Sequence, residues 1–464
     1  MAFRNSTVGA FTFFQGDEVM PEQDLIKRME ADGVKFLSLQ FTDLLGTVKS
    51  VDIPAHRVPD ALEQGVWFDG SSVEGFARIQ ESDMQLHLDT STYQILPWSV
   101  PERRRARVLC DIFNTDGTPF EGDPRYILKK QLARAKDMGY SFNVGPELEF
   151  FLLRPTNGGS GQAVPHDVGS YFDFSASDEA QRVRNAIVLA LEAMGLEVEM
   201  SHHEVALGQH EIDFKYADAL RTADNSITFK YVVKAVANAH DLLATFMPKP
   251  IFGINGSGMH THQSLFSLDG KNMFFDPNDA FKLTPIAYSY LAGQLKHARA
   301  LAAIVAPTVN SYKRLVPGYE APVYVCWAQM NRSALIRIPR YTPGNDQATR
   351  IELRFPDPSC NPYLAFAAIL AAGLDGIKQK LTPPPNVNNI DVYHFTPAEL
   401  KERGIGVLPG TLEEALMELE QDEVVRSVLG EHSYEDYMRV KRGEWDDYRI
   451  RVSQWELERY LETA

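Results

Sequence analysis

The stretch from Lys249 to Ser264 reads KPIFGINGSGMHTHQS and is the most informative run in the chain. Its first half contains three glycines, which let the backbone approach a ligand closely and adopt positive φ angles. Its second half alternates, so that on a β-strand His260 and His262 point to the same face. A polar strand face beside a glycine-rich loop predicts a binding site. The alternative is a glycine loop followed by a solvated edge strand.

The composition is that of an ordinary globular protein, with 464 residues of which 44% are hydrophobic and 23% charged. The length predicts two or more domains. A net charge of −16 argues against nucleic acid or an anionic membrane as a partner. No apolar run of about 18 residues occurs, so no membrane span is predicted. Residues 1–20 lack the features of a secretory signal, and the three cysteines form no CxxC pair, so we expect a cytoplasmic protein with reduced thiols.

Turn-forming residues divide the chain between residues 114 and 124. Residues 1–20 form an amino-terminal extension. Residues 21–113 are rich in strand-like runs and include a predicted short helix at 61–68. Residues 122–464 mix helices and strands without strict βαβ alternation, and several strands carry one polar face. We therefore expect an α+β protein whose larger domain contains an antiparallel sheet with helices on its apolar side.

Acidic residues recur on one face of successive predicted strands. Two share the face of one strand, two bracket a hairpin, and one lies between two arginines: Glu147, Glu149, Glu204, Glu211 and Glu352. Five carboxylates with the imidazole of His260 suit Mg²⁺ or Mn²⁺ better than a structural zinc ion. A single glutamate on a strand is usually solvated. Repeated polar faces, by contrast, must line something wet, charged or metal-bound, because burying them alone is costly.

Arginines crowd into the region that follows: Arg314, Arg332, Arg337, Arg350 and Arg354. Their guanidinium groups match carboxylate and phosphate oxygens. Acids for metals beside arginines for anions indicate phosphoryl transfer, and the alternative is a network of salt bridges. No Walker-type or kinase motif occurs, so an ATP site would be of another kind. The loop 310–320 reads either as a flap over the site or as an ordinary surface loop.

Several long motifs resemble those of glutamine synthetase in its type I form, found in bacteria and archaea. They are Phe41–Asp43, Phe68–Ser72, Asn255–His260, Asn310–Pro322, Asn331–Ser333 and Arg350–Asp357. The resemblance runs from about residue 20 to the carboxyl end. It implies a small β-grasp-like domain and a catalytic domain with a curved antiparallel sheet. It also implies active sites between the subunits of hexameric rings, two of which form a homododecamer.

The resemblance implies a role for each matched residue. The metal ligands would be Glu147, Glu149, Glu204, Glu211, His260 and Glu352, for two or three Mg²⁺ ions per active site, with Mn²⁺ as an alternative. Glutamate would be bound by Asn255, Gly256, Arg314, Glu320 and Arg354. ATP would be bound by Glu199, Phe214, Lys215, Tyr216, His262, Ser264, Arg332, Arg337 and Arg350. The catalytic residues would be Asp43 (lent by the neighbouring subunit), the flap acid Glu320, and Arg332.

The implied reaction ligates ammonia to the γ-carboxylate of L-glutamate through γ-glutamyl phosphate, with ATP converted to ADP and phosphate. One alternative is a γ-glutamyl ligase that uses another amine, although Asp43 and Glu320 favour the small ammonium cation. Another alternative is a glutamine-sensing regulatory pseudoenzyme. The presence of all six matched metal ligands argues against it. A contact with a PII-type or transcriptional regulator is compatible with catalysis.

Two departures from the family pattern concern regulation. The segment between Phe151 and Tyr171 is short and lacks the insertion of the adenylylated branch, which identifies the short branch. Tyr393 falls near the tyrosine that is modified in the adenylylated branch, but its flanking residues differ, so adenylylation is not expected. Arg78 resembles the arginine used for feedback inhibition by glutamine in the short branch.

Overall fold

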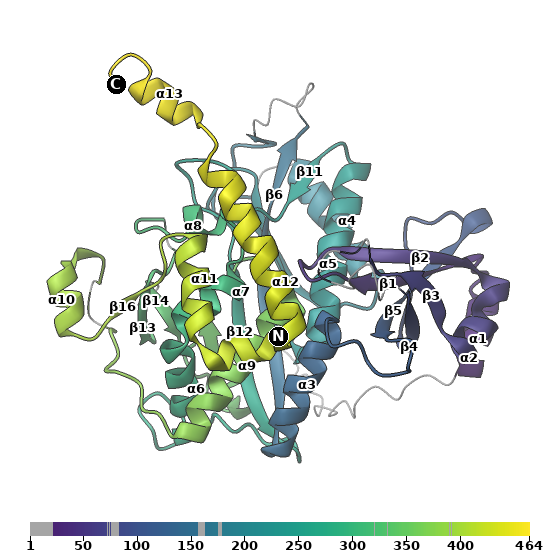
Figure 1. Ribbon diagram of the computed structural model, residues 1–464, viewed down its shortest axis with the longest axis horizontal. Coiled ribbons are helices and arrows are strands. Elements are labelled where there is room, and N and C mark those ends of the chain that lie inside the picture. The colour runs from purple at the N-terminus through teal and green to yellow at the C-terminus, as the bar shows by residue number, and fades with distance from the viewer. Residues whose placement is uncertain are drawn as a thin grey trace, which may run out of the picture.

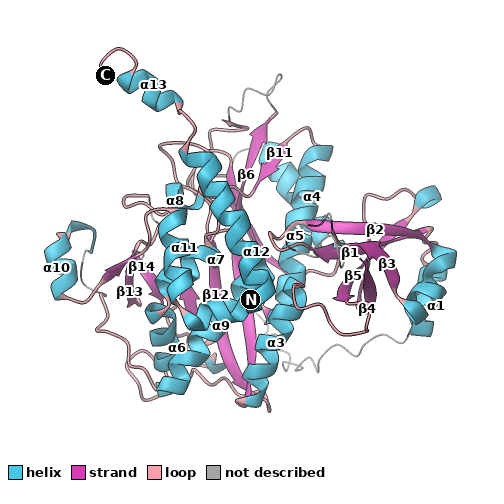
Figure 2. Cartoon of the chain, viewed as in Figure 1, coloured by secondary structure: helices cyan, strands magenta, loops and turns pink. Residues whose placement is uncertain are grey.

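The computed structural model describes residues 22–71, 73, 75, 83–155, 163–174, 179–319, 321–331, 333–388, 390 and 392–464. Within these residues, the chain forms two β-sheets, each packed against helices (Figures 1 and 2). The smaller sheet contains residues from the amino-terminal quarter of the chain, and the larger sheet contains residues from the remainder. No helix in the described part of the chain is long and apolar enough to cross a membrane.

The smaller sheet has the strand order β2-β1-β5-β4-β3. Its strands are β1 (Phe36–Thr42), β2 (Val48–Pro54), β3 (Val66–Asp69), β4 (Asp83–Ile95) and β5 (Arg105–Phe113). Neighbouring strands are antiparallel except for the parallel pair β1–β5. Helices α1 (Glu22–Ala31) and α2 (Val58–Gln64) cover its apolar face, where Leu25, Leu37 and Val108 are buried. The predicted helix at 61–68 is wrong in its bounds: α2 has Pro59 in its first turn and ends at Gln64, with Gly65 as its C-cap, after which β3 begins.

The larger sheet has 11 strands within the described residues, with β16-β13-β14-β15-β12-β6-β9-β8 as its main path. Its strands are β6 (Tyr140–Arg154), β7 (Val164–Pro165), β8 (Val198–His203), β9 (Gln209–Phe214), β10 (Ala217–Asp218), β11 (Leu243–Thr245), β12 (Met259–Ser267), β13 (Tyr324–Ala328), β14 (Ala334–Arg337), β15 (Ile351–Leu353) and β16 (Gly406–Val407). The pairing is antiparallel apart from the parallel pair β13–β14. The α+β architecture predicted from the sequence is confirmed, with a mixed rather than purely antiparallel sheet.

The helices of the larger domain lie mostly on the apolar face of its sheet, and the last of them extends away from the body (Figure 1). They are α3 (Pro124–Asp137), α4 (Glu179–Ala193), α5 (Ala219–Ala239), α6 (Pro285–Lys296), α7 (Ala298–Val305), α8 (Ser311–Arg314), α9 (Pro362–Gln379), α10 (Pro397–Glu402), α11 (Leu412–Gln421), α12 (Glu423–Arg449) and α13 (Gln454–Tyr460). The central strand β6 explains this arrangement. Its buried side chains Phe142, Val144 and Leu148 alternate with more exposed ones, so one face packs on α3 and α5 and the other stays open.

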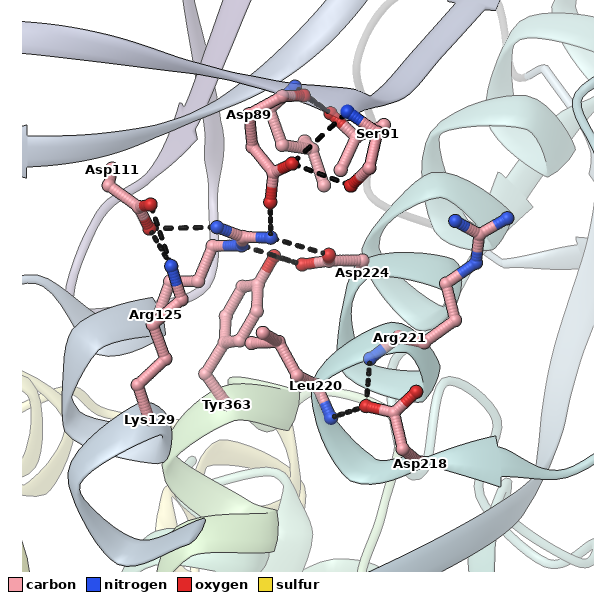
Figure 3. A network of polar contacts seen from close by, with 12 residues as sticks. Asp89, Ser91, Asp111, Arg125, Lys129, Asp218, Leu220, Arg221, Asp224 and Tyr363 are labelled. Carbon is pink, nitrogen blue, oxygen red and sulfur yellow. Dashed lines mark hydrogen bonds and ion pairs between the residues drawn. The ribbon is translucent and has the colours of Figure 1, made fainter. Parts of the chain in front are cut away.

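A buried arginine joins the two sheets (Figure 3). Arg125 on α3 makes ion pairs with Asp89 of β4 (2.6 Å), Asp111 of β5 (2.7 Å) and Asp224 of α5 (3.0 Å). Asp224 also accepts a hydrogen bond of 2.6 Å from the hydroxyl of Tyr363 on α9. One guanidinium therefore pairs with three carboxylates, two of them from the smaller sheet. Removing any member of such a buried network leaves a charge without its partner, which destabilises the folded protein.

A second connection involves the turn between β1 and β2. The side-chain amide of Asn361, which caps α9, donates hydrogen bonds to the backbone oxygens of Asp43 (3.2 Å) and Leu44 (3.3 Å). Gly46 packs against Asn361 so closely that an added Cβ would lie 3.0 Å from its Cα, and its φ of +85° favours glycine as well. The turn is thereby fastened to the larger domain.

Candidate active site

The open face of the larger sheet carries a row of charged side chains that the strand register places side by side. Glu149 of β6 is opposite Glu211 of β9, and Glu147 is opposite His260 of β12. Further along, Glu352 of β15 is opposite both His262 and Arg337. Directly opposed residues lie close enough for their side chains to interact. The predicted strand at 259–264 is confirmed, and its alternation places both histidines on the open face.

One cluster is formed by Glu147, His260, His262 and Glu352. Nδ1 of His260 lies 3.2 Å from Glu147 and 3.8 Å from Glu352, and Nε2 of His262 lies 2.8 Å from Glu147. Nε of Arg350 donates to Nδ1 of His262 at 3.1 Å, and arginine can only donate. Nε2 of His262 must therefore carry the proton and donate to Glu147, which leaves His262 without a free lone pair. Among the described residues no arginine donates to His260, whose Nδ1 contacts only carboxylates, so it is the histidine of this cluster that can bind a cation.

The charges of this cluster are balanced within the protein. Burial would raise the pKa of Glu147, but hydrogen bonds from His260 and His262 outweigh it and lower the pKa. Burial also opposes ionisation of the fully buried Glu352, whose pKa is nevertheless lowered by Arg354, the two histidines and Arg337. Both carboxylates are thus held as anions, which is the form that binds a metal ion.

A second cluster contains Glu149, Glu204 and Glu211 with the unpredicted residue His202. Nε2 of His202 lies 2.9 Å from Glu204 and 3.8 Å from Glu211. Burial and the negative charge of Glu204 raise the pKa of Glu149 to about 8. Burial and Glu149 raise the pKa of Glu211 to about 11. The carboxylates in this cluster repel one another, and a bound cation would relieve that repulsion.

The donor set therefore fits divalent cations. One atom each of His202, Glu204 and Glu211 lie within 4.8 Å of one another, and in the first cluster Nδ1 of His260 lies within 3.8 Å of both Glu147 and Glu352. Oxygen ligands dominate both groups, as Mg²⁺ and Mn²⁺ prefer. The uncompensated acids of the second cluster are the observation that most directly indicates a missing positive charge.

The glycine-rich loop borders this second cluster. The backbone N–H of Gly258 donates to Glu149 at 3.1 Å, and a Cβ at this position would lie 2.6 Å from Nη2 of Arg314. A Cβ at Gly256 would lie 2.2 Å from the backbone oxygen of Pro248. Gln209, which is buried, donates to both Glu149 (2.8 Å) and the backbone oxygen of Gly256 (3.1 Å). Glycine is required at both positions because the loop passes tightly between these groups.

Three arginines lie beside the two clusters. Arg314 is buried, and it donates to the backbone oxygens of Phe355 at 2.9 Å and Arg354 at 3.1 Å. Arg354 donates to Glu352 at 2.9 Å, while its buried Nε has no hydrogen-bond partner among the described atoms. Arg337 also contacts Glu352. An unpaired buried donor is costly, which makes Arg354 a candidate for binding an acceptor.

The other matched residues lie at differing distances from the clusters. A Cβ at Gly145 would lie 3.1 Å from Cβ of Tyr216 and 3.9 Å from Cβ of His262, so both side chains border the same narrow space. Glu199 is exposed, and Ser264 lies on the same face of β12 as His262. The side chain of Phe214 instead packs in the core, which leaves only its backbone for a ligand.

Lys215 and Asp43 have partners away from the row. The ammonium of Lys215 pairs with Glu197 at 3.0 Å. The carboxylate of Asp43 accepts hydrogen bonds from its own turn and lies 3.3 Å from Lys49. Asn255 lies in the glycine-rich loop beside Gly256. Glu320, Arg332, Arg78 and the extension 1–20 lie outside the described residues, and the side chain of Tyr393 does as well.

Sequence reasoning missed three polar residues of this face: His202, Gln209 and Asp213. Each is two residues from a predicted ligand, so the same alternation that identified Glu211 also identifies Gln209 and Asp213. Burial and the charge of Glu147 raise the pKa of Asp213 to about 7. The alternation was visible in the sequence. The position of these side chains beside the predicted ligands of neighbouring strands depends instead on the register of β8, β9 and β6.

Comparison with known proteins gives a consistent result. Residues 33–115 match the family "Glutamine synthetase, beta-Grasp domain", and residues 121–460 match "Glutamine synthetase, catalytic domain". Similar proteins include the glutamine synthetases of Halobacterium salinarum (54% identical, covering 95% of this chain and 96% of that protein) and Thermus thermophilus (53% identical, 95% and 98%).

Solved structures agree with these matches. The chain resembles a structure titled "GmaS/ADP complex" with a TM-score of 0.86 and 36% identity, over 95% of this chain and 99% of that chain. It also resembles the glutamine synthetase of Plasmodium falciparum, with a TM-score of 0.84 and 28% identity, over 95% and 98% of the two chains.

Proposed function

Since the chain belongs to the glutamine synthetase family, we propose that its open sheet face is where ATP drives the ligation of ammonia to glutamate, through γ-glutamyl phosphate. The enzyme makes L-glutamine, with ADP and phosphate as co-products. The observation that carries the assignment of the site is the row of acids on β6, β9 and β15, bordered by the glycine-rich loop and by arginines. Reaction between two anions requires positive charge at the site, and this row is built to hold it.

We propose that two or three Mg²⁺ ions, or Mn²⁺ ions, bind in this row. Glu147, His260 and Glu352 would hold one ion, supported by the position of the His260 imidazole within 3.8 Å of both carboxylates. Glu149, Glu204 and Glu211 would hold another, supported by their mutual repulsion. When bound, such ions neutralise phosphate oxygens during phosphoryl transfer.

The arginines and the glycine-rich loop would bind the substrates. Asn255, Gly256, Arg314 and Arg354 are proposed to bind glutamate, and the unpaired Nε of Arg354 supports a carboxylate partner there. The residues proposed to bind ATP are Glu199, Phe214 (through its backbone), Lys215, Tyr216, His262, Ser264, Arg332, Arg337 and Arg350. The side chains of Tyr216 and His262 both begin beside Gly145, and rings of this kind suit a planar base.

Three residues are proposed to act on the reacting groups. Asp43 of a neighbouring subunit would accept a proton from ammonium, because ammonia attacks only after losing it. Glu320 would close over γ-glutamyl phosphate, and Arg332 would stabilise charge on the transferred phosphoryl group. For Asp43, the support is that its carboxylate lies apart from the acid row of its own chain.

We further propose a homo-oligomer, specifically a dodecamer of two hexameric rings. It is supported by the carboxyl-terminal segment, which extends away from the body (Figure 1) and exposes large apolar side chains: Ile450, Val452, Trp455 and Leu461. We also propose feedback inhibition by glutamine through Arg78, and a PII-type or transcriptional regulator as partner. The proposed location is the cytoplasm, and the proposed domains are residues 21–113 and 122–464. Three buried unpaired cysteines support a reducing compartment.

The test is an assay of glutamine formation and phosphate release that depends on ATP, glutamate, ammonia and Mg²⁺. Glu352→Gln keeps the size of the side chain but removes its charge, and it should lower kcat/KM at least about 100-fold. The exposed Glu199, proposed only as a nucleotide contact, provides a comparison: Glu199→Gln should chiefly raise the KM for ATP. A fully active Glu352→Gln enzyme would refute the metal assignment.

A further inference from the structure

The turn between β8 and β9 carries Glu204, and it is held from the side opposite the acid row. The turn runs from Glu204 to Gly208, and its two strands each place one buried histidine, His203 and His210, on the core face of the sheet. Asp167 follows β7 and reaches this core face. Its Oδ1 accepts a hydrogen bond of 2.8 Å from the backbone N–H of Gly208, the last residue of the turn.

The same carboxylate also reaches the first residue of the turn, through His203. Nε2 of His203 lies 3.1 Å from Asp167, and its Nδ1 donates to the backbone oxygen of Glu204 at 2.6 Å. Both ring nitrogens face oxygens that only accept, so the ring is fixed in orientation by two charged or strongly polar contacts. Asp167 therefore holds one end of the turn directly and the other end through an imidazole.

The chain around Asp167 leaves His203 little freedom. A Cβ at Gly169 would lie 2.5 Å from Nε2 of His203, so glycine is needed to admit the ring. The backbone N–H of Phe172 donates to the backbone oxygen of His203 at 3.1 Å, and Phe172 has a φ of +60°, which costs energy in a bulky residue. Strain of this kind persists where surrounding contacts fix the backbone.

The turn is also backed by the central strand. Gly208 has a φ of +70°, and its backbone oxygen accepts a hydrogen bond of 2.8 Å from the N–H of Leu152 on β6. β7 itself pairs with the end of β6, with Pro165 opposite Leu153. The segment that carries Asp167 and the strand that carries Glu149 are thus one rigid unit, against which the position of Glu204 is set.

We propose that Asp167 is a positioning residue for cation binding: with His203 it fixes Glu204 relative to Glu149 and Glu211. This inference rests on the proposed metal role of these acids. Mg²⁺ demands near-ideal octahedral geometry, whereas Ca²⁺ accepts six to eight ligands in flexible arrangements. Loosening the turn therefore weakens Mg²⁺ binding more than Ca²⁺ binding, and it shifts the selectivity of the site as well as its affinity.

The test measures Mg²⁺ and Ca²⁺ binding to the full chain by titration calorimetry, without substrates. Asp167→Asn keeps an acceptor for Gly208 but loses the charge that faces His203. It should raise the Mg²⁺ dissociation constant of the weakened site about tenfold and change that for Ca²⁺ clearly less. Asp173→Asn is the matched control, because Asp173 lies on the same segment, is exposed, and bonds only locally with the N–H of Ser170 at 2.8 Å. It should bind both ions as the wild type does.

Two variants of His203 separate positioning from simple loss of structure. His203→Gln can keep the contact with Asp167 and loses the one with Glu204, and His203→Asn does the reverse. If the residues act as one connection, each should lower the preference for Mg²⁺, and combining either with Asp167→Asn should add little. Both variants place a polar side chain in the space beside Gly169, and both leave Asp167 unchanged. They therefore test the inference even if Asp167→Asn unfolds.

The outcomes distinguish this inference from the proposed function. A wild-type chain that binds no divalent cation overturns both. A wild-type chain that binds Mg²⁺, while the Asp167 and His203 variants keep its affinity and its preference over Ca²⁺, overturns the positioning role alone. Equal weakening of both cations by Asp167→Asn also overturns it, because a general loss of structure would have that effect.

Discussion

Glu149 and Glu211 are directly opposite each other on neighbouring strands, with both carboxylates buried on the open face of the sheet. Opposed like charges destabilise a strand pair. We expect Glu211→Gln to make the metal-free protein more stable, by roughly 1 kcal/mol, while it abolishes stabilisation by Mg²⁺ at this cluster. Urea denaturation in chelator and in Mg²⁺ measures both effects. Glu197→Gln is the control, since Glu197 pairs with Lys215 on the surface. A metal-free Glu211→Gln protein less stable than wild type contradicts the prediction.

The same two acids predict a pH dependence. Burial and the charge of Glu204 raise the pKa of Glu149 to about 8, and burial and the charge of Glu149 raise the pKa of Glu211 to about 11. Above the usual glutamate pKa of about 4.3, the unfolded chain has released protons that the folded chain still holds, so stability falls as the pH rises. Metal-free protein should therefore lose stability from about pH 5 to pH 9, and stabilisation by Mg²⁺ should increase over the same interval. Thermal unfolding across this range measures it, and a constant effect of Mg²⁺ would contradict the raised pKa values.

The two histidines of β12 should respond differently to removal. His260→Ala removes the imidazole beside Glu147 and Glu352, so the Mg²⁺ concentration for half-maximal activity should rise about tenfold or more. His262→Ala breaks the connection between Arg350 and Glu147 and should chiefly raise the KM for ATP. Steady-state kinetics with Mg²⁺ and ATP varied separately give both values. Identical effects of the two variants would show that His262 also binds the metal.

Arg125 should be among the residues on which stability depends most. Arg125→Met leaves the carboxylates of Asp89, Asp111 and Asp224 without their shared cation, which should cost about 3–5 kcal/mol. A denaturant titration followed by circular dichroism measures this cost. Arg125→Lys keeps the charge but cannot reach three acids, and it should fall between wild type and Arg125→Met. A cost near zero would mean that the network adds no stability.

His297 provides a pH dependence far from the acid row. Its ring lies between Asp422 (2.6 Å) and Asp375 (2.9 Å), and Asp375 also pairs with Lys296. Burial lowers the pKa of His297, but the two acids outweigh it and raise the pKa. The stabilisation is therefore complete below the unfolded pKa of about 6.5, and it disappears as the pH rises through the folded value. In saturating Mg²⁺, His297→Gln should flatten this part of the pH–stability curve. An unchanged curve would exclude the contribution.

The sequence was sufficient for the parts of the site that depend on alternation within one strand. His260 and His262, or Glu147 and Glu149, share a face whatever their neighbours are. Partnership across strands was not predictable, because it depends on register: nothing local places Glu149 opposite Glu211 or Glu147 opposite His260. The parallel pair β13–β14 and the strand β3 in place of a helix also depend on which strands become neighbours. The core side chain of Phe214 shows the same limit, since a matched motif does not fix which way a side chain points.

The hydrogen bonds from Asn361 to the turn at Asp43 have a consequence for assembly. A single folded chain already holds this turn in one conformation, with its backbone tied to the start of α9. The entropy of ordering its backbone, about 1–2 kcal/mol per residue, is therefore lost when the chain folds rather than when subunits meet. Association then joins preformed surfaces, and its rate is governed by encounter and orientation instead of by the slow ordering of a loop.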